Sequence, residues 1–520
     1  MNEPAAGIIP PPPSPRPRWW LLLVILAAGA VACFVLWFVP HRSRQHFNLN
    51  IARVILFTLG ALLVWLFVFS RLRWRVRWVV AACGIAVAGL PAAAFRIRGV
   101  DGDLVPILEF RWAHRDLAKP AATDGNIPAN RLPGAADFPQ FLGPNRNGVL
   151  AGPRLATNWT ARPPAQLWRQ PVGAAWSGFA VAGATAITQE QRGSDEVVVA
   201  YDLATGRALW SHADPVRYFT TLAGEGPRAT PAIAGQRVIA LGATGVLNCL
   251  DLATGRLLWT KDILKEHGGG LPDWGVSGSP LVFDDLVVVN PGGGDNRSVV
   301  AYQLADGALR WTAGRRGASY SSPLVTTIAG VRQVLLFGGT LAGHDAASGD
   351  VLWEFRWPGG HPHIAMPVRV TESDWILSSG YGTGSARVSV ARDGAGKWSA
   401  KQVWRTNRLK SKFANPVLHR GHVYGLDDGI LACLDAETGG LRWKDGKYGH
   451  GQVLLVGELL LVMAESGEVV LLDPRPDGLR ELARLAALAG KTWNPPALAG
   501  EYLLVRNDSE AACFRLPVMQ

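Results

Sequence analysis

The stretch Ala200-Tyr-Asp-Leu-Ala-Thr-Gly-Arg-Ala-Leu-Trp210 decides the fold, because versions of it recur along the rest of the chain. Its common form is Ala-x-Asp-x-x-Thr-Gly-x-x-x-Trp. Further copies occupy residues 249–259, 301–311, 343–353 and 433–443, and degraded copies end at Trp404 and near Leu482. The closing tryptophans recur every ~40–50 residues, a period typical of propellers and solenoids. The chain therefore repeats one structural unit.

Each repeat predicts a four-stranded sheet. Short runs rich in β-branched residues, such as Val197-Val-Val-Ala-Tyr201, indicate strands. In Asp-x-x-Thr-Gly the Asp can bond its own backbone and the Gly supplies a positive φ, so this segment predicts a tight turn. A return strand ends at the Trp, another strand precedes the repeat, and a lead-in segment comes before that strand. Four such strands make a propeller blade. The lead-in segments usually carry a proline, at Thr230-Pro231, Ser279-Pro280, Ser322-Pro323, Met366-Pro367, Asn415-Pro416 and Asn494-Pro495.

The number of repeats predicts eight blades. Full or degraded repeats supply seven hairpins, and Glu510-Ala-Ala-Cys-Phe-Arg-Leu516 is an eighth strand without a tryptophan partner. Ala165-Gln-Leu-Trp168 offers that partner from the N-terminal side, which would close the ring and remove its open edges. We therefore expect an all-β fold over residues 138–520, an eight-bladed β-propeller of four-stranded blades.

The positive charge of the chain lies at its N-terminal end. The formal net charge is +11, and residues 1–98 contribute eleven arginines, no lysine and one acid. Residues 99–520 hold 41 basic and 40 acidic side chains, so the predicted propeller is nearly neutral. A basic surface for nucleic acid is therefore not indicated, and no nucleic-acid partner is expected.

The N-terminal region predicts a membrane anchor. Residues 1–18 are rich in proline and predict a disordered cytoplasmic tail. Three apolar runs follow, at about 19–39, 51–70 and 78–95, each near the roughly 20 residues that a transmembrane helix needs. The length of the first run and the runs behind it argue against a cleaved signal peptide. We expect the lipid bilayer to be the partner of these helices.

The arginines predict the orientation of the anchor. Arg71-Leu-Arg-Trp-Arg-Val-Arg77 is the densest positive loop, and the positive-inside rule places it in the cytoplasm together with the N-terminus. Three crossings then leave everything after residue 98 outside the cytoplasm, which in a Gram-negative bacterium is the periplasm. Residues 99–137, partly rich in Ala, Pro, Gly and Asn, predict a periplasmic linker.

The repeats carry a family resemblance. They resemble those of pyrroloquinoline-quinone-like (PQQ-like) β-propellers, and Phe138-Pro-Gln-Phe-Leu-Gly-Pro-Asn-Arg-Asn-Gly148 is similar to the opening motif of their membrane-anchored bacterial branch. The resemblance covers about residues 138–520. That family includes quinoprotein dehydrogenases and a non-enzymatic propeller of the outer-membrane protein assembly machinery, and the fold does not choose between them. With the anchor and orientation inferred from the apolar runs and arginines, we expect a bacterial inner-membrane location and a periplasmic propeller, with periplasmic or envelope proteins as candidate partners.

The repeated residues are assigned to structure. The resemblance implies that the closing tryptophans stack between adjacent blades, where each ring would bury ~150–250 Å². The repeated aspartates fill one turn position in different blades and therefore do not form a carboxylate cluster. Cysteines fall on one strand position of separate blades, too far apart for a disulfide. These aspartates are Asp202, Asp251, Asp345 and Asp435, and these cysteines are Cys249, Cys433 and Cys513.

Several marks of catalysis are missing from the sequence. Many alcohol-oxidising quinoproteins carry an adjacent cysteine pair, which this sequence lacks, and it has no Cys-x-x-Cys-His haem attachment. A calcium site of Glu, Asn and Asp cannot be recognised from spacing. His361-Pro-His363 has no third ligand nearby, and Gly380-Tyr-Gly-Thr-Gly384 lies between two strands, which predicts a hairpin. No catalytic residue and no metal site are assigned.

A ligand site, if present, is expected at the mouth of the central channel. The lead-in segments approach the channel, and convergent polar and aromatic groups there are the usual form of a small-molecule site. A planar anionic quinone would need an aromatic floor and basic groups at its carboxylates. The candidate cofactor-binding residues are Arg228, Trp274, Tyr320, Lys412 and Trp493. The alternative is a water-filled channel without a ligand.

Two functions remain open. The favoured hypothesis is a membrane-anchored periplasmic scaffold or binding module without a cofactor, which docks proteins or peptides by its rim and strand edges. The alternative is a membrane-bound quinoprotein dehydrogenase that uses PQQ with calcium to oxidise an alcohol or a sugar.

Overall fold

The computed structural model describes residues 17–39, 44–113 and 132–519, and the chain divides into two compact units at residue 113. The cytoplasmic tail predicted for residues 1–18 lies outside the described residues, apart from its last two positions.

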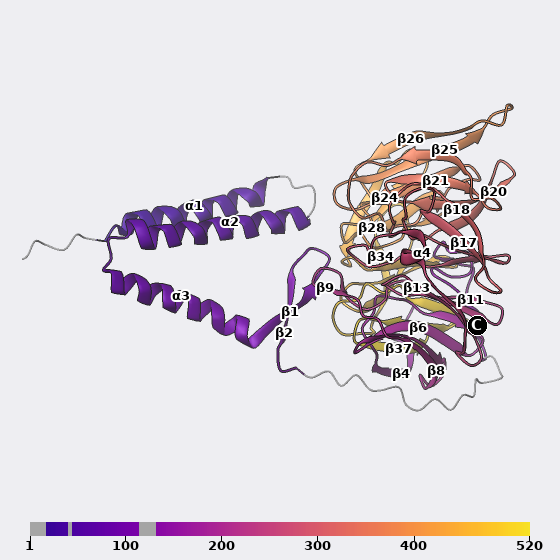
Figure 1. Ribbon diagram of the computed structural model, residues 1–520, viewed down its shortest axis with the longest axis horizontal. Helices are drawn as coiled ribbons and strands as arrows, with labels where there is room; N and C mark the ends of the chain where they lie inside the picture. The colour runs from indigo at the N-terminus through magenta and orange to yellow at the C-terminus, as the bar shows by residue number, and fades with distance from the viewer. Residues whose placement is uncertain (1–16, 40–43, 114–131, 520) are drawn as a thin grey trace, which may run out of the picture. The chain divides into compact units, whose positions relative to one another are not determined.

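Three long helices make up most of the first unit (Figure 1). They are α1 (Trp19–Phe38), α2 (Arg44–Val64), which continues as the π-helix η1 (Trp65–Phe69), and α3 (Trp74–Ala94). All three are long and apolar enough to cross a membrane, by length and composition. The second and third helices begin at Arg44 and Trp74, before the apolar runs at 51 and 78, because flanking polar residues extend the same backbone hydrogen bonding. An antiparallel hairpin, β1 (Phe95–Val100) with β2 (Pro106–Phe110), lies in the segment where the linker was predicted to begin.

The described residues of the second unit form eight four-stranded antiparallel blades, as predicted. Blade 1 consists of β5 (Ala180–Ala182), β6 (Thr185–Arg192), β7 (Asp195–Asp202) and β8 (Ala208–Asp214), and blade 2 consists of β11 (Ala232–Ala234), β12 (Arg237–Leu241), β13 (Val246–Asp251) and β14 (Leu257–Asp262). Blade 3 consists of β15 (Leu281–Phe283), β16 (Leu286–Val289), β17 (Val299–Gln303) and β18 (Leu309–Ala313). Blade 4 consists of β19 (Leu324–Ile328), β20 (Val331–Phe337), β21 (Thr340–Asp345) and β22 (Val351–Arg356).

Blade 5 consists of β23 (Val368–Arg369), β24 (Asp374–Ser379), β25 (Gly384–Arg392) and β26 (Trp398–Thr406), and blade 6 consists of β27 (Val417–His419), β28 (His422–Asp427), β29 (Ile430–Asp435) and β30 (Leu441–Lys447). Blade 7 consists of β31 (Gln452–Val456), β32 (Leu459–Met463), β33 (Glu468–Asp473) and β34 (Arg480–Ala486). Blade 8 consists of β35 (Ala497–Ala499), β36 (Tyr502–Arg506), β37 (Glu510–Arg515) and β4 (Ala165–Pro171). The shorter elements are β3 (Val149–Leu150), β9 (Phe219–Thr220), β10 (Gly224–Glu225) and the helix α4 (Ile263–His267).

The ring closes in blade 8, which combines strands from both ends of the propeller. Strand β4 pairs with β37 and places Trp168 opposite Cys513, which confirms the predicted partner (Figure 1). Arg506, 1% exposed, also ties blade 8 to blade 1 through bonds to Thr188 Oγ1 (2.8 Å) and the Gly173 carbonyl (2.7 Å). Closure completes blade 8, so that no blade is left with strands missing and an extra sheet edge open to other chains.

The outer rim of the propeller is built from one contact made repeatedly between neighbouring blades. Most closing tryptophans stand opposite a small residue of their own blade, as Trp259 stands opposite Cys249, whereas Trp404 stands opposite Arg387. The Trp259 ring packs on the turn glycine of the next blade: a Cβ built on Gly307 would lie 2.9 Å from this ring. The indole N–H of Trp259 donates to the Leu304 carbonyl of that turn at 3.1 Å. The same ring-on-glycine contact recurs at Trp168–Gly206, Trp210–Gly255, Trp311–Gly349 and Trp404–Gly439.

The lead-in segments form a hydrogen-bonded belt around the central channel. Where the residue before the proline is Thr, Ser or Asn, its side chain bonds the backbone of a neighbouring blade, as when Gly178 N donates to Thr230 Oγ1 (3.1 Å). Thr230 N in turn donates to Ser279 Oγ (2.9 Å), and Ser279 N donates to Ser322 Oγ (2.9 Å). In another pair of blades Met366 N donates to Asn415 Oδ1 (2.8 Å), and between blades 8 and 1 the direction is reversed, because Asn494 Nδ2 donates to the Ser177 carbonyl (2.8 Å). The polar residues before the prolines therefore have a structural role.

Residues 138–150, which contain the opening motif, form a plug across the channel. Phe138 exchanges backbone bonds with Val181 of β5, and β3 pairs in parallel with β31 of blade 7. Arg146, 2% exposed, donates to the Ser279 and Pro280 carbonyls of blade 3, at 3.0 Å each, and to Gln140. Blades 1, 3 and 7 lie on different sides of the ring, so this segment spans the channel between them.

Candidate functional site

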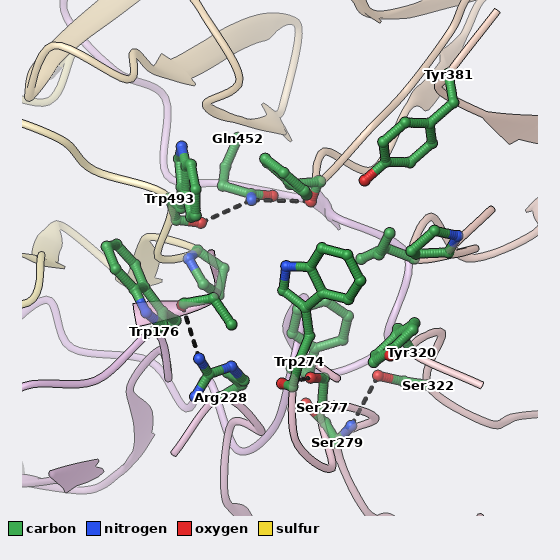
Figure 2. A pocket seen from close by; sticks show the side chains of 16 residues that line it. Trp176, Arg228, Trp274, Ser277, Ser279, Tyr320, Ser322, Tyr381, Gln452 and Trp493 are labelled. Atoms are coloured by element: carbon green, nitrogen blue, oxygen red, sulfur yellow. Dashed lines mark hydrogen bonds between the residues drawn. The ribbon is translucent and has the colours of Figure 1, made fainter. Parts of the chain in front are cut away.

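A cavity of about 120 Å³ opens at the mouth of the channel and is lined mostly by aromatic rings. Phe141 belongs to the plug, so the plug forms one wall, and the other rings come from the loops and lead-in segments of several blades (Figure 2). The sequence reasoning placed candidate chemistry in these irregular segments because the repeats diverge there. The rings are Phe141, Trp176, Trp274, Tyr320, Tyr381, Phe413 and Trp493.

Four of the five candidate residues line this cavity. Arg228, Trp274, Tyr320 and Trp493 come together around it, as Figure 2 shows. Lys412 lies outside the lining, 2% exposed, with its ammonium nitrogen 5.3 Å from the centre of the Tyr381 ring. Sequence position therefore located the channel mouth, although it could not separate wall residues from the layer behind them.

The Arg228 guanidinium is committed to the protein itself. It donates to the carbonyls of Ala223 (2.7 Å), Gly224 (3.1 Å) and Gly226, and lies 4.5 Å from the centre of the Tyr218 ring. Burial lowers the pKa of Arg228 to about 10, so the group stays protonated at neutral pH. Its role in the structure is to hold the β9–β10 hairpin, which carries Ala223 into the cavity wall.

The aromatic walls are preorganised by ring contacts. The rings of Trp176 and Trp493 lie 5.0 Å apart, and Phe413 lies 4.7 Å from Trp493. Trp274 and Tyr320 form an edge-to-face pair at 5.9 Å. The first two pairs are tilted and the third is edge-on, and aromatic pairs at these separations attract one another, so the walls are held before any ligand enters.

Most polar atoms of the lining already have protein partners. Ser279 and Ser322 belong to the belt, and Gln452 Nε2 donates to the carbonyls of Phe413 (3.0 Å) and Trp493 (2.8 Å). Ser277 Oγ donates to the Trp274 carbonyl at 3.1 Å (Figure 2). These groups stabilise the wall and leave a largely apolar surface facing the cavity.

Tyr381 was not among the candidate residues, yet its side chain lines the cavity. Its hydroxyl points toward the centre (Figure 2) and makes no hydrogen bond with another described residue. The ring stacks against His361 at 5.1 Å, and burial raises the pKa of Tyr381 well above its usual value, so the phenol is neutral. The sequence signal was the Gly380-Tyr-Gly-Thr-Gly384 hairpin between β24 and β25, which predicted the turn and left its tyrosine unexplained.

A second, polar cleft of about 540 Å³ adjoins the cavity between blades 3, 4 and 5. It shares Trp274 and Tyr320 with the aromatic cavity. His363, 7% exposed, lies edge-on to Phe337 at 5.3 Å, and burial lowers the pKa of His363 to about 4. Within the described part of the chain, no three His, Cys, Asp or Glu side chains gather as a metal site.

Pyrroloquinoline quinone with calcium does not fit the lining of the aromatic cavity. No Asp or Glu side chain lines it, although calcium takes six to eight oxygen ligands, often carboxylates. The one basic lining residue, Arg228, is committed to carbonyls and cannot neutralise several carboxylates. The volume of about 120 Å³ is comparable with the ~150 Å³ of a cavity that binds benzene, a single ring, so it cannot enclose the three fused rings of the quinone.

Among known proteins, a bacterial kinase matches part of this chain. The kinase AfsK of Streptomyces coelicolor, a serine/threonine-protein kinase, is 28% identical over 176 residues, which cover 32% of this chain and 19% of the kinase. The chain thus spans about a fifth of the length of that relative.

Two solved structures share the fold. A europium-containing methanol dehydrogenase matches 73% of this chain and 98% of its own, with 12% identity and a TM-score of 0.55. The quinohemoprotein alcohol dehydrogenase of Comamonas testosteroni matches 74% of this chain and 81% of its own, with 12% identity and a TM-score of 0.55. At this identity the likeness concerns the fold alone. A family model described as outer membrane protein assembly factor BamB matches residues 145–271 and 243–480, more than half of the chain. The chain therefore belongs to the family of this assembly factor, a family of PQQ-like repeat β-propellers.

Proposed function

We propose that this protein is a membrane-anchored binding module whose channel-mouth face docks a protein of the bacterial cell envelope. The three long apolar helices support the anchor, and the arginine loop at residues 71–77 supports a cytoplasmic N-terminus with a periplasmic propeller. The family description, an outer-membrane protein assembly factor, supports a role in contacts between proteins.

An exposed apolar lip beside the cavity carries the proposal. The lip consists of Phe219 (46% exposed), Leu222 (49%) and Leu271 (55%) on two neighbouring loops. The Tyr218 hydroxyl donates to the Asp273 carbonyl and joins the two loops, so the lip is held in place without a partner. Large apolar side chains gathered on a surface mark interaction sites, and preformed surfaces bind at a lower entropic cost. Ala223 and Trp274 follow the lip residues in sequence and line the aromatic cavity, so the lip continues into the cavity.

Photo-crosslinking in intact cells tests the docking face. A photoreactive phenylalanine analogue at position 219 is expected to give one reproducible adduct with an envelope protein. The same analogue at Leu309, which is 54% exposed on the outer strand of blade 3, is the matched control and should give none. Equal adducts from both positions, or no adduct at position 219, would overturn the docking face, and a cytoplasmic partner would overturn the orientation.

A quinoprotein dehydrogenase is the alternative, favoured by the aromatic rings at the channel mouth. An aromatic lining of this kind suits a planar cofactor. The absence of carboxylates from the lining and the bonds of Arg228 to carbonyls do not suit an anionic quinone bound with calcium. Adding pyrroloquinoline quinone and calcium to the full chain in detergent is expected to give no bound-cofactor spectrum and no dye reduction with alcohols or sugars. A bound spectrum that disappears in Trp274→Ala would establish the alternative.

A further inference from the structure

We propose that the aromatic cavity binds one uncharged six-membered ring carrying an acceptor oxygen, and that the Tyr381 hydroxyl donates the hydrogen bond that recognises this oxygen. The inference goes beyond the docking proposal, because it concerns the interior of the cavity, whereas docking concerns the apolar lip. Crosslinking from position 219 tests the lip, and small-molecule binding tests the cavity.

The size and lining of the cavity limit the ligand to a single ring. Its volume of about 120 Å³ is comparable with the ~150 Å³ of an apolar cavity that takes up benzene. Rings on several sides, including Trp176, Trp274 and Phe413, offer both stacking and edge contacts to a flat guest. A larger ligand would place one ring inside and leave the remainder outside the mouth.

The charges around the cavity favour an uncharged guest. An anion finds no uncommitted cation on the wall, because Arg228 donates to three carbonyls. A cation would bind over the faces of the tryptophan rings, but the Lys491 ammonium already occupies this position. It lies 4.0 Å from the centre of the Trp493 ring and 4.4 Å from that of Trp176. Lys412 lies over Tyr381 in the same way. A second positive charge would be repelled by both lysines.

The Tyr381 hydroxyl is the polar group of the lining that offers itself to a ligand. It points into the cavity (Figure 2), and no described residue accepts its proton or donates to it. Trp176 Nε1 and Gln452 Oε1 also lack a partner among the described residues, but both atoms are buried within the wall. Because the phenol is neutral, it presents an O–H donor in apolar surroundings, where a hydrogen bond to a carbonyl or ether oxygen discriminates well. Other wall hydroxyls, such as Ser277, already donate to backbone carbonyls.

The backbone at Tyr381 indicates that this orientation is imposed. Its φ is +59°, a left-handed conformation that is unfavourable for a bulky side chain. Strained backbone of this kind persists where the surroundings determine it and concentrates at binding sites. The His361 stack and Lys412 hold the ring in the inward position, and Gly382 and Gly384 (φ +83° and +90°) allow the chain to turn back into β25. A glycine at position 381 would form the same turn, so the tyrosine is required for its side chain.

Calorimetry on the full chain in detergent tests the proposal with three probes of similar size. Acetophenone carries a carbonyl acceptor, ethylbenzene has nearly the same shape without oxygen, and benzoate is an anion. We expect Tyr381→Phe to weaken acetophenone binding about fivefold, the usual effect of one neutral hydrogen bond, and to leave ethylbenzene unchanged. Benzoate should bind at least about tenfold more weakly than acetophenone. Comparing the two proteins in one detergent cancels the partitioning of each probe into micelles.

Tyr320→Phe is the matched control, because Tyr320 also lines the cavity but is paired edge-on with Trp274. Its loss of affinity for acetophenone should be smaller than that of Tyr381→Phe. No binding of acetophenone, equal loss for acetophenone and ethylbenzene in Tyr381→Phe, a larger loss in Tyr320→Phe than in Tyr381→Phe, or preferred binding of benzoate would each overturn the proposal. A lost crosslink from position 219 with normal acetophenone binding would instead count against docking alone.

Discussion

The outer rim and the channel mouth belong to the same blades, but they are specified in different ways. On the rim one contact recurs, a tryptophan ring on the turn glycine of the next blade, as at Trp259 and Gly307. At the mouth the blades differ: one contributes Trp274, another Tyr381, and the plug adds Phe141. Positions where the repeats agree build the ring, and positions where they diverge shape the cavity. Substitutions on the rim should therefore lower stability, whereas substitutions at the mouth should alter binding.

The largest expected effect is the loss of one rim contact. Trp259→Ala removes a ring that is 8% exposed, its contact with Gly307 and its hydrogen bond to the Leu304 carbonyl. We expect the free energy of unfolding to fall by about 3–5 kcal/mol, as for large-to-small changes in other cores. Urea unfolding followed by circular dichroism measures this loss, and acetophenone affinity should not change.

The control for the rim is Leu309→Ala, an exposed position on an outer strand of the next blade. Its expected cost is below about 0.5 kcal/mol. An unfolding midpoint of Trp259→Ala equal to that of Leu309→Ala would contradict the assignment of the repeat tryptophans to the contacts between blades.

A substitution in the plug should affect both regions. Arg146→Met keeps most of the side-chain volume and removes the donors to the Ser279 and Pro280 carbonyls. We expect the free energy of unfolding to fall by about 2–3 kcal/mol. The loss is limited because burying the Arg146 charge is itself unfavourable, as its lowered pKa of about 9 shows, and methionine removes this charge. Because Phe141 lies in the same plug, acetophenone affinity should fall together with stability.

The exposed Arg154 lies just beyond the plug, and Arg154→Met provides the matched control. It should leave both unfolding and acetophenone binding unchanged within about 0.5 kcal/mol. Normal ring binding in a destabilised Arg146→Met protein would show that the plug closes the channel without shaping the cavity.

The sequence predicted the ring and its closure because repetition makes local patterns redundant. Five copies of one motif located the rim tryptophans, and the unpaired strand ending at Leu516 pointed to Trp168. The plug could not be predicted, because Phe138 to Gly148 occurs once and its partners are distant in sequence, as Arg146 and Ser279 are.

The candidate cavity lies in the region that the sequence indicated, and four of the five candidate residues line it. The irregular lead-in segments located the channel mouth, but their polar residues, such as Thr230 and Ser279, proved to belong to the belt. Arg228 is a cation at the expected place with its donors already engaged, which depends on the β9–β10 hairpin. Tyr381 was missed because the inward direction of its side chain follows from a positive φ that no residue pattern encodes.

The smallest expected effect is on the pH dependence of stability. It differs in sign between His363, which lies beside the channel mouth, and Glu196, which lies between blades 1 and 2. Burial and the neighbouring His361 lower the pKa of His363 to about 4, opposed by a hydrogen bond to the Pro358 backbone. As pH falls from about 6.5 to 4, the unfolded chain therefore binds the proton before the folded chain does. The contribution of His363 to stability is complete above this pH range and is lost as pH falls through it.

Glu196 has the opposite pH dependence. Burial raises the pKa of Glu196 to about 7, although hydrogen bonds from Ala243 N oppose this shift. The folded chain therefore holds the proton more tightly than the unfolded chain, and stability falls as pH rises from about 4.5 to 7.

The two slopes oppose each other between pH 5 and pH 7, so single variants should separate them. Relative to the wild type, His363→Gln should gain about 1–2 kcal/mol of unfolding free energy on going from pH 7 to pH 5, because the variant no longer loses the contribution of a neutral histidine. Glu196→Gln should change by a similar amount in the opposite direction. Urea unfolding at a series of pH values measures both differences, and using differences cancels the other buried histidines. A His363→Gln profile parallel to that of the wild type would mean that His363 is hydrated and titrates normally, and that the polar cleft, unlike the aromatic cavity beside it, is open to water at its base.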